Sequence, residues 1–339
     1  MRFKFRMNRR AVLFSLISVL FSVLFITIFS QEFTSTYEDR IPGSNIRIKV
    51  MDVYTRNFEV YIGDSVKVAT YHTLDGITIY QHNNGRMFFK DFSEFNKTFR
   101  DCMTCGYVNC SNQIPSKSCN VGDYSLKSRL DNITALSLQQ LNIQTNYTLN
   151  SIDIRQDYPF EVEVTVNISY NVTDDSGANY YARWTKNSII TQEVPIVGLL
   201  EPTGYINDST NTYRQRIARY SGVCEFDESC WTNTTTQQFY SQNNFRYYSG
   251  GVSFLQRYWN DNSVSDCCGI ETIMHPTQLS NPDRTNSYID HYYWSGSYSC
   301  AAGNKIVSLK FGSDNVSLDE NTASRYGVTN QSTVYCTPP

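Results

Sequence analysis

The sequence FEVEVTVNISYNVT, residues 160–173, alternates apolar and polar side chains without interruption. A period of two puts successive side chains on opposite faces of a β-strand, so this stretch predicts a strand with one buried and one solvated face. The turn signal DDSG follows at residues 174–177. Alternation then resumes in the return stretch at Ala178, Tyr180, Ala182 and Trp184. We therefore predict a long antiparallel hairpin over residues 158–198.

A helical pattern precedes the hairpin, from Ile46 to about Ile79. Its apolar and aromatic side chains follow steps of three, four or seven residues: Met51, Tyr54, Phe58, Tyr61, Val68 and His72. Pro42-Gly43 breaks the chain before this pattern, and Asn83-Asn84-Gly85 ends it. The range 31–85 is therefore predicted to be a helical stem.

The N-terminal sequence predicts a membrane anchor. Residues 11–29, AVLFSLISVLFSVLFITIF, carry no charge and no helix breaker, which at ~1.5 Å per residue spans a hydrocarbon core of roughly 30 Å. Five basic residues and no acidic one precede this run, as the positive-inside rule expects of a cytoplasmic flank. We predict a basic cytoplasmic tail at 1–10, a single transmembrane helix at 11–30 in the plasma membrane, and an extracellular remainder. The alternative is a signal peptide cleaved after Ser30, although the run exceeds the usual h-region of about 7–15 residues.

All ten cysteines lie beyond the predicted membrane segment, which favours disulfides in an oxidising compartment. They are Cys102, Cys105, Cys110, Cys119, Cys224, Cys230, Cys267, Cys268, Cys300 and Cys336. The first four have the spacing C-x2-C-x4-C-x8-C, for which a zinc knuckle is the alternative to disulfides. The neighbours Cys267 and Cys268 are expected to form two separate bridges, and a strained vicinal disulfide between them is the less common alternative. We predict a Cys-rich loop region at 86–150 and a β-rich head at 151–339, with connectivity left open.

Ten N-x-S/T sequons support a surface location and predict glycosylation. Their asparagines are Asn96, Asn109, Asn132, Asn146, Asn167, Asn171, Asn207, Asn233, Asn315 and Asn330. Five of the 29 basic residues lie in the first ten positions, so the remaining chain has 24 basic residues against 32 acidic ones. This balance argues against a nucleic-acid partner, which would need a concentrated basic face. The 25 tyrosines fit either protein contact surfaces or the core of a disulfide-rich fold.

Several short stretches resemble the archaeal type IV pilin-like, membrane-anchored surface proteins. They are RRAVLFSLISVLFSVLF (9–25), VPIVGLLEP (194–202), SFLQRYWND (253–261), GIETIMHP (269–276) and SYIDHYYW (287–294). The resemblance implies an N-terminal hydrophobic helix leading into an extracellular β-rich head. The chain departs from that family where Arg9-Arg10 lead straight into Ala11, because no small residue marks a prepilin-peptidase site and no glutamate lies in the run. The resemblance therefore implies the topology and does not by itself imply a filament.

Signals for catalysis or metal binding are sparse, and we expect no enzyme activity and no cofactor. The best constellation joins Glu271, His275, Asp290 and His291 to Cys267, Cys268 and Cys300, as a Cys/His pair or a small metal site. Oxidised cysteines would supply no thiolate for either chemistry. A calcium site would draw on Asp261, Asp266, Asp283 and Asp290, without EF-hand spacing.

The sequence thus predicts an α+β protein with an N-terminal transmembrane helix, a helical stem and a disulfide-stapled extracellular head built on an antiparallel sheet. Its expected function is that of a cell-surface structural or adhesive protein that contacts copies of itself, another surface protein or a glycan. A membrane-tethered carbohydrate- or ligand-binding ectodomain is the alternative, with exposed aromatic rings as stacking platforms. A membrane-tethered hydrolase is the second alternative.

Overall fold

A computed structural model describes residues 43–175, 182–208, 213–225, 227–275, 288–296, 305–311, 314–328 and 333–335. The chain divides into two compact units, residues 1–50 and 51–339. Within the described residues no helix combines the length and hydropathy of a membrane span. The predicted tail and anchor at 1–30 lie outside these residues, as do Cys300, Cys336, Asp283 and Asn330.

The predicted long helix is present as α2, Gly43–Asn83, and it ends at the predicted Asn-Asn-Gly signal. Its first two turns belong to the first unit, and the remainder is part of the core of the second. From Ile62 to Gln81 the helix buries many small and polar side chains besides its apolar ones. The helix passes very close to the chain at Cys119, since a Cβ atom at Gly76 would lie 2.0 Å from the carbonyl oxygen of Cys119. Only a glycine fits at this position. We expected this segment to be a stem, and in the structure its residues from Met51 onward are part of the core.

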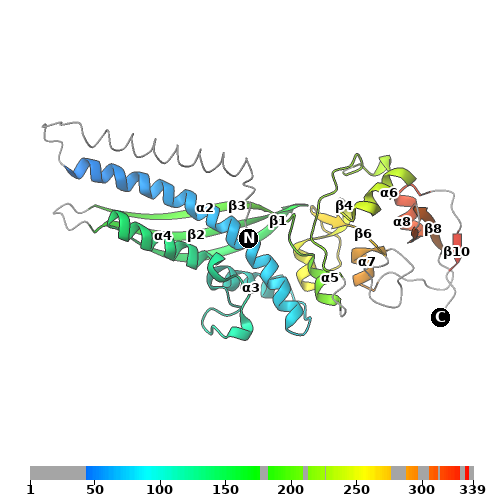
Figure 1. The fold of residues 1–339 in the computed structure, drawn as a ribbon, viewed down its shortest axis with the longest axis horizontal. Helices are drawn as coiled ribbons and strands as arrows, with labels where there is room; N and C mark the ends of the chain where they lie inside the picture. Colours follow the sequence, from blue (N-terminus) through cyan, green and yellow to red (C-terminus); the bar gives the residue numbers. More distant parts are fainter. Residues whose placement is uncertain are drawn as a thin grey trace, which may run out of the picture. The chain divides into compact units, whose positions relative to one another are not determined.

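The main sheet has three antiparallel strands in the order β1-β2-β3 (Figure 1). They are β1 (Ile143–Tyr158), β2 (Glu161–Asp174) and β3 (Arg183–Pro195). The predicted hairpin is confirmed as β2 and β3, with Val162 opposite Val194 and Thr173 opposite Arg183. The predicted face of β2 is also confirmed, because Val162, Val164, Val166, Ile168, Tyr170 and Val172 are all at most 1% exposed. Strand β1 was not predicted.

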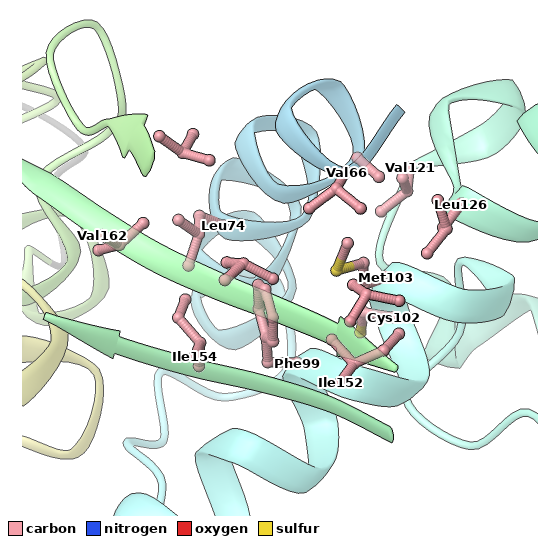
Figure 2. Packing of buried hydrophobic residues seen from close by; sticks show 14 of the residues in the cluster. Val66, Leu74, Phe99, Cys102, Met103, Val121, Leu126, Ile152, Ile154 and Val162 are labelled. Carbon is pink, nitrogen blue, oxygen red and sulfur yellow. The ribbon is translucent and has the colours of Figure 1, made fainter. Parts of the chain in front are cut away.

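The buried face of the sheet packs against α2 and α3 (Phe92–Cys105). Figure 2 shows Val66 and Leu74 of α2 and Phe99 and Met103 of α3 beside Ile154 and Val162 of the strands. Leu126 and Leu130 of α4 (Leu126–Leu141) join the same cluster. Both α3 and α4 lie in the range predicted to be a Cys-rich loop region. Asp91 caps α3 through the amide of Glu94, and Ser125 caps α4 through that of Ser128.

The rest of the second unit is built from short elements: α5 (Pro202–Asn207), α6 (Asn233–Gln242), β4 (Arg246–Ser253), the 3₁₀ helix η4 (Leu255–Trp259), β5 (Gly269–Glu271), β6 (Ile273–Met274), β7 (Tyr288–Ile289), α7 (Asp290–Trp294), β8 (Lys305–Phe311), β9 (Asp314–Asp319), α8 (Glu320–Arg325) and β10 (Thr333–Tyr335). All the sheets are antiparallel, as β10-β8-β9, β4-β5 and β6-β7. Many tyrosines pack in the core here, among them Tyr213, Tyr220, Tyr258 and Tyr326 at 1% exposure or less. The α+β class with antiparallel sheets is therefore as predicted.

Four disulfides join described cysteines: Cys102–Cys119, Cys105–Cys110, Cys224–Cys230 and Cys267–Cys268. They indicate an oxidising, extracellular environment. The last bond corrects one expectation, since Cys267 and Cys268 pair with each other and not with two other partners. The two residues follow the turn after η4, and both sulfurs lie beside the carbonyl oxygen of Gln156, at 3.4 and 3.2 Å. Because Cys102, Cys105, Cys110 and Cys119 are all bonded, the zinc alternative for them has no free thiolates.

Candidate functional site

Four of the short stretches that carry the pilin-like resemblance meet at one buried cluster of charges. Each contributes one carboxylate or guanidinium: Glu201, Arg257, Glu271 and Asp290. Arg246 of β4 and Arg325 of α8 complete the cluster, which then holds three acidic and three basic side chains. The three carboxylates are fully buried, so each charge must be balanced inside the protein.

Arg257 of η4 is the centre of the first half of this cluster. Its guanidinium donates to Glu201 Oε1 at 2.8 Å, to Asp290 Oδ2 at 2.5 Å and to the backbone oxygen of Ile270 at 2.7 Å. Glu201 in turn caps α5 by accepting from the amides of Thr203 and Gly204. One guanidinium therefore ties the start of α5, the start of α7 and strand β5 together.

Glu271 is the centre of the second half. Its Oε1 accepts from Arg246 at 2.7 Å and from the Tyr326 hydroxyl at 2.6 Å, and Arg325 lies 3.1 Å from Oε2. The Arg246 guanidinium also lies over the ring of Trp231, 5.1 Å from its centroid. A guanidinium that donates to several acceptors fixes the relative positions of these acceptors and also balances the carboxylate charge.

The carboxyls of the cluster differ in proton affinity. Burial opposes ionisation at Asp290, but Arg257 and His291 hold its pKa down to about 2. Burial likewise opposes ionisation at Glu271, yet Arg325 and Arg246 lower its pKa below the usual value. At Glu201, burial raises the pKa, and the neighbouring Asp290 adds to this while Arg257 opposes it. Glu201 is therefore the carboxyl of the cluster that takes up a proton first on acidification.

We expect the stability difference between the natural chain and Asp290→Asn to depend on pH. A carboxyl with a depressed folded pKa adds stability above its unfolded pKa of ~3.9 and loses it as pH falls toward the folded value. Because the pKa of Asp290 is about 2, the natural chain should exceed the variant in stability from pH 7 to about 4. The difference should then shrink toward pH 2. Chemical denaturation across this range measures it, and a constant difference would contradict the assignment.

The predicted catalytic constellation is brought together only in part. His291 lies 3.4 Å from Asp290 and acts electrostatically on Glu271, but all three are buried in the charge cluster. His275 instead stacks on Tyr240, with ring centroids 5.2 Å apart. Cys267 and Cys268 are bonded to each other, and Cys300 lies outside the described residues. The described part of this constellation is thus arranged for packing and charge balance, with no nucleophile exposed.

The predicted calcium ligands are also apart. Asp290 pairs with Arg257, whereas Asp261 accepts from the amide of Ser263 in its own loop. Across the described ranges, no group of three or more acidic, histidine or cysteine side chains is arranged to hold a metal ion.

The sequon asparagines whose side chains the structure describes are all at least partly exposed. Asn167 and Asn171 lie on the outer face of β2, as predicted. That face is a polar ladder, in which Asn150 donates to Asn167 at 3.0 Å and Thr185 donates to Asn171 at 2.7 Å. Glycosylation itself stays a prediction.

A polar groove of about 460 Å³ is lined by residues of α2, of α4 and of the segment 120–124 that joins α3 to α4. His72 of α2 stacks on Tyr124 at its edge, with ring centroids 3.8 Å apart. Tyr61 and Arg129 line it as well, the guanidinium lying 5.7 Å from the centre of the Tyr61 ring. The sequon residue Asn132 is also part of the lining.

Helix α2 has a second apolar face, opposite the one that packs on the sheet. In the second unit Val53 and Val60 are 56% and 66% exposed, and Asn57 between them is also exposed. The core side of the same turns carries Met51, Thr55, Phe58 and Ile62, all buried. A helix that covers a sheet on one side normally carries polar residues on the other, so the two exposed valines make this side a candidate contact surface.

Comparison of the chain with protein-family models, with curated proteins and with solved structures found no match. The pilin-like resemblance therefore stays a prediction, and function is argued from these surfaces.

Proposed function

We propose that this protein is a cell-surface structural or adhesive protein that assembles with copies of itself, anchored by its predicted N-terminal helix. The observation that carries the proposal is the second apolar face of α2. Val53 and Val60 are more than half exposed on this helix. A second surface that covers them would gain ~25 cal/mol of stabilisation for each Å² of apolar area removed from water. Their side of the helix carries none of the ten sequons, which all lie at residue 96 or beyond.

The buried charge cluster supports the structural part of this proposal. It joins segments from Glu201 to Arg325 through ion pairs, with its carboxylates away from solvent. Such a cluster specifies one arrangement of a core and offers no access to a substrate. Together with the disulfides, it suits a protein that must keep its shape outside the cell.

Self-association is tested on the full chain in its membrane. A short amine-reactive bifunctional reagent should join copies into dimers or larger species, and electron microscopy of the same membranes should show regular contacts. Diluting the membranes with excess lipid is the control, because random collisions fall with dilution while specific contacts persist. A chain that stays monomeric at its native density would overturn the proposal.

Ligand binding is the second candidate, favoured by the groove at His72 and Tyr124. Stacked aromatic rings beside Arg129 and Asp123 are the kind of surface that a polar, ring-shaped ligand such as a sugar contacts. A glycan on Asn132 would fill the groove, so ligand binding requires this sequon to be unoccupied, whereas self-association does not. Peptide mapping that finds Asn132 fully glycosylated would exclude the groove as a binding site.

A further inference from the structure

The exposed residues of α2 follow the spacing of a coiled coil. Val53, Asn57 and Val60, here called the α2 seam, are separated by four and then three residues. The same alternation continues toward the N-terminus of the helix to Val50 and Ile46. In a heptad repeat these are successive a and d positions, with Val60, Val53 and Ile46 at d and Asn57 and Val50 at a.

The seam ends sharply on its C-terminal side. The next two positions of the repeat are Asp64 and Lys67, which are charged and exposed. The apolar stripe therefore covers about two heptads and stops where a continuing partner helix would have to bury charges. From Met51 onward the opposite side of the helix is buried in the core, so this part of the helix is already formed before any partner arrives, which lowers the ordering cost of pairing.

Asn57 indicates that the partner of the seam is an identical helix. A single asparagine at an a position lowers the stability of a coiled coil but selects paired helices in one register, where the two amides bond to each other. A membrane segment or a random apolar surface would leave this amide without a partner. An identical helix supplies one.

The pairing of the core positions selects the parallel orientation. Arg56 occupies the g position beside Asn57, and Tyr61 occupies the next e position. In a parallel pair, g meets e of the following heptad, so Arg56 lies near an uncharged ring of the other copy. In an antiparallel pair, a positions pack against d positions of the other copy, so Asn57 would face a valine and its amide would have no partner. Arg56 is already paired with Asp52 of its own helix at 2.6 Å, so its charge does not decide the orientation. The predicted N-terminal anchors would also place two copies in the same orientation.

We infer that two copies of this chain pair through the α2 seam as a short parallel coiled coil, with Asn57 facing Asn57. The inference rests on the proposed function and adds to it the partner, the face, the orientation and the register. Two heptads bury little area, so the pairing depends on the copies being held in one membrane.

Cysteine cross-linking of the full chain in membranes tests this geometry. Val53→Cys and Val60→Cys are introduced singly, with Lys97→Cys on the exposed side of α3 as the matched control. Under mild oxidation both seam variants should give covalent dimers, at least about tenfold more than the control. Adding Asn57→Lys to Val60→Cys should reduce dimers by a similar factor, because two ammonium groups cannot share the a position, whereas Asn57→Gln should retain them. Unchanged protease resistance confirms that each variant is folded.

Three outcomes would overturn the inference. If mixed Val53→Cys and Val60→Cys copies cross-link to each other and neither does so with itself, the helices are antiparallel. If neither variant cross-links but the bifunctional reagent still joins copies, assembly uses another face and the proposed function survives alone. If both experiments give monomers and the seam cysteines resist a membrane-impermeant maleimide, a segment of the same chain covers the seam, and both proposals fall.

Discussion

Replacing Arg257 with methionine is expected to lower the free energy of unfolding by about 3–5 kcal/mol. The guanidinium is 1% exposed and is the shared partner of Glu201 and Asp290. Methionine has a similar length but supplies no donor, so two carboxylates stay buried without it. Chemical denaturation of the purified protein at pH 7 measures the loss, and reduced export of the variant should accompany it.

Lys127→Met is the matched control, because it also removes one partner of an ion pair. Lys127 and Asp131 are one turn apart on α4, and their side chains are 58% and 48% exposed. An exposed pair of this kind contributes about 0.3–0.5 kcal/mol, so the control should be close to the natural chain. If both variants lose equally little, the buried cluster does not have the role assigned to it.

Val164→Lys is expected to cost at least about 3 kcal/mol and to prevent export of most of the protein. Val164 is fully buried on the helix-covered face of β2, between Ile154 of β1 and Gln192 of β3. A lysine there would place an ammonium group among the apolar side chains of the core. The yield of exported protein and its denaturation midpoint measure the effect.

Thr165→Lys is the control one residue away, on the outer face of the same strand. Its neighbour across β1 is Asp153, so the new charge has a favourable partner, and the only bond lost is the 3.1 Å contact with Thr191. The expected change is within about 0.5 kcal/mol. Equal tolerance at both positions would mean that the register of the sheet is wrong.

The regular parts of the fold were predictable because their periods are unbroken. Strand β2 alternates over its whole length, and the end of α2 carries an Asn-Asn-Gly signal. Strand β1 was not predicted because its period of two is interrupted. Its alternation runs through Ile143, Thr145, Tyr147 and Leu149, and the pairing register then shifts between Leu149 and Ser151. The apolar phase changes with it to Ile152 and Ile154, which hides the period of two.

Helix α3 was missed although a signal for it exists. Asp91 and Glu94 stand at N-cap and N3 positions, and Phe95, Phe99, Cys102 and Met103 follow at helical spacing. Because four cysteines lie close together between residues 102 and 119, we predicted a loop there instead. All four disulfides among the described residues join cysteines that are close in sequence, at separations of 17 residues or fewer.

The charge cluster was beyond sequence reasoning for a different reason. We predicted Glu271, Asp290 and His291 as candidate catalytic or metal-binding residues, but we did not predict the arginines that pair with them. Arg257 lies 56 residues from Glu201 and 33 from Asp290, and nothing periodic links these positions. Only the folded backbone brings them together. The exposed valines of α2 were likewise visible in the sequence, but a second apolar face appears only once the first is known to be buried.

The central position of α2 has a consequence for export. Residues of this helix complete their contacts only with segments made much later, since the hydroxyl of Tyr258 donates to the carbonyl of Leu74 across 184 positions. At a synthesis rate of ~5–20 residues per second, this partner appears roughly 10–40 s after the helix does. Until β2 (Glu161–Asp174) has been made, the side of α2 that packs on the sheet also lacks its main partner, so both apolar faces of the helix are uncovered. Premature pairing between neighbouring nascent chains is then a hazard for correct folding.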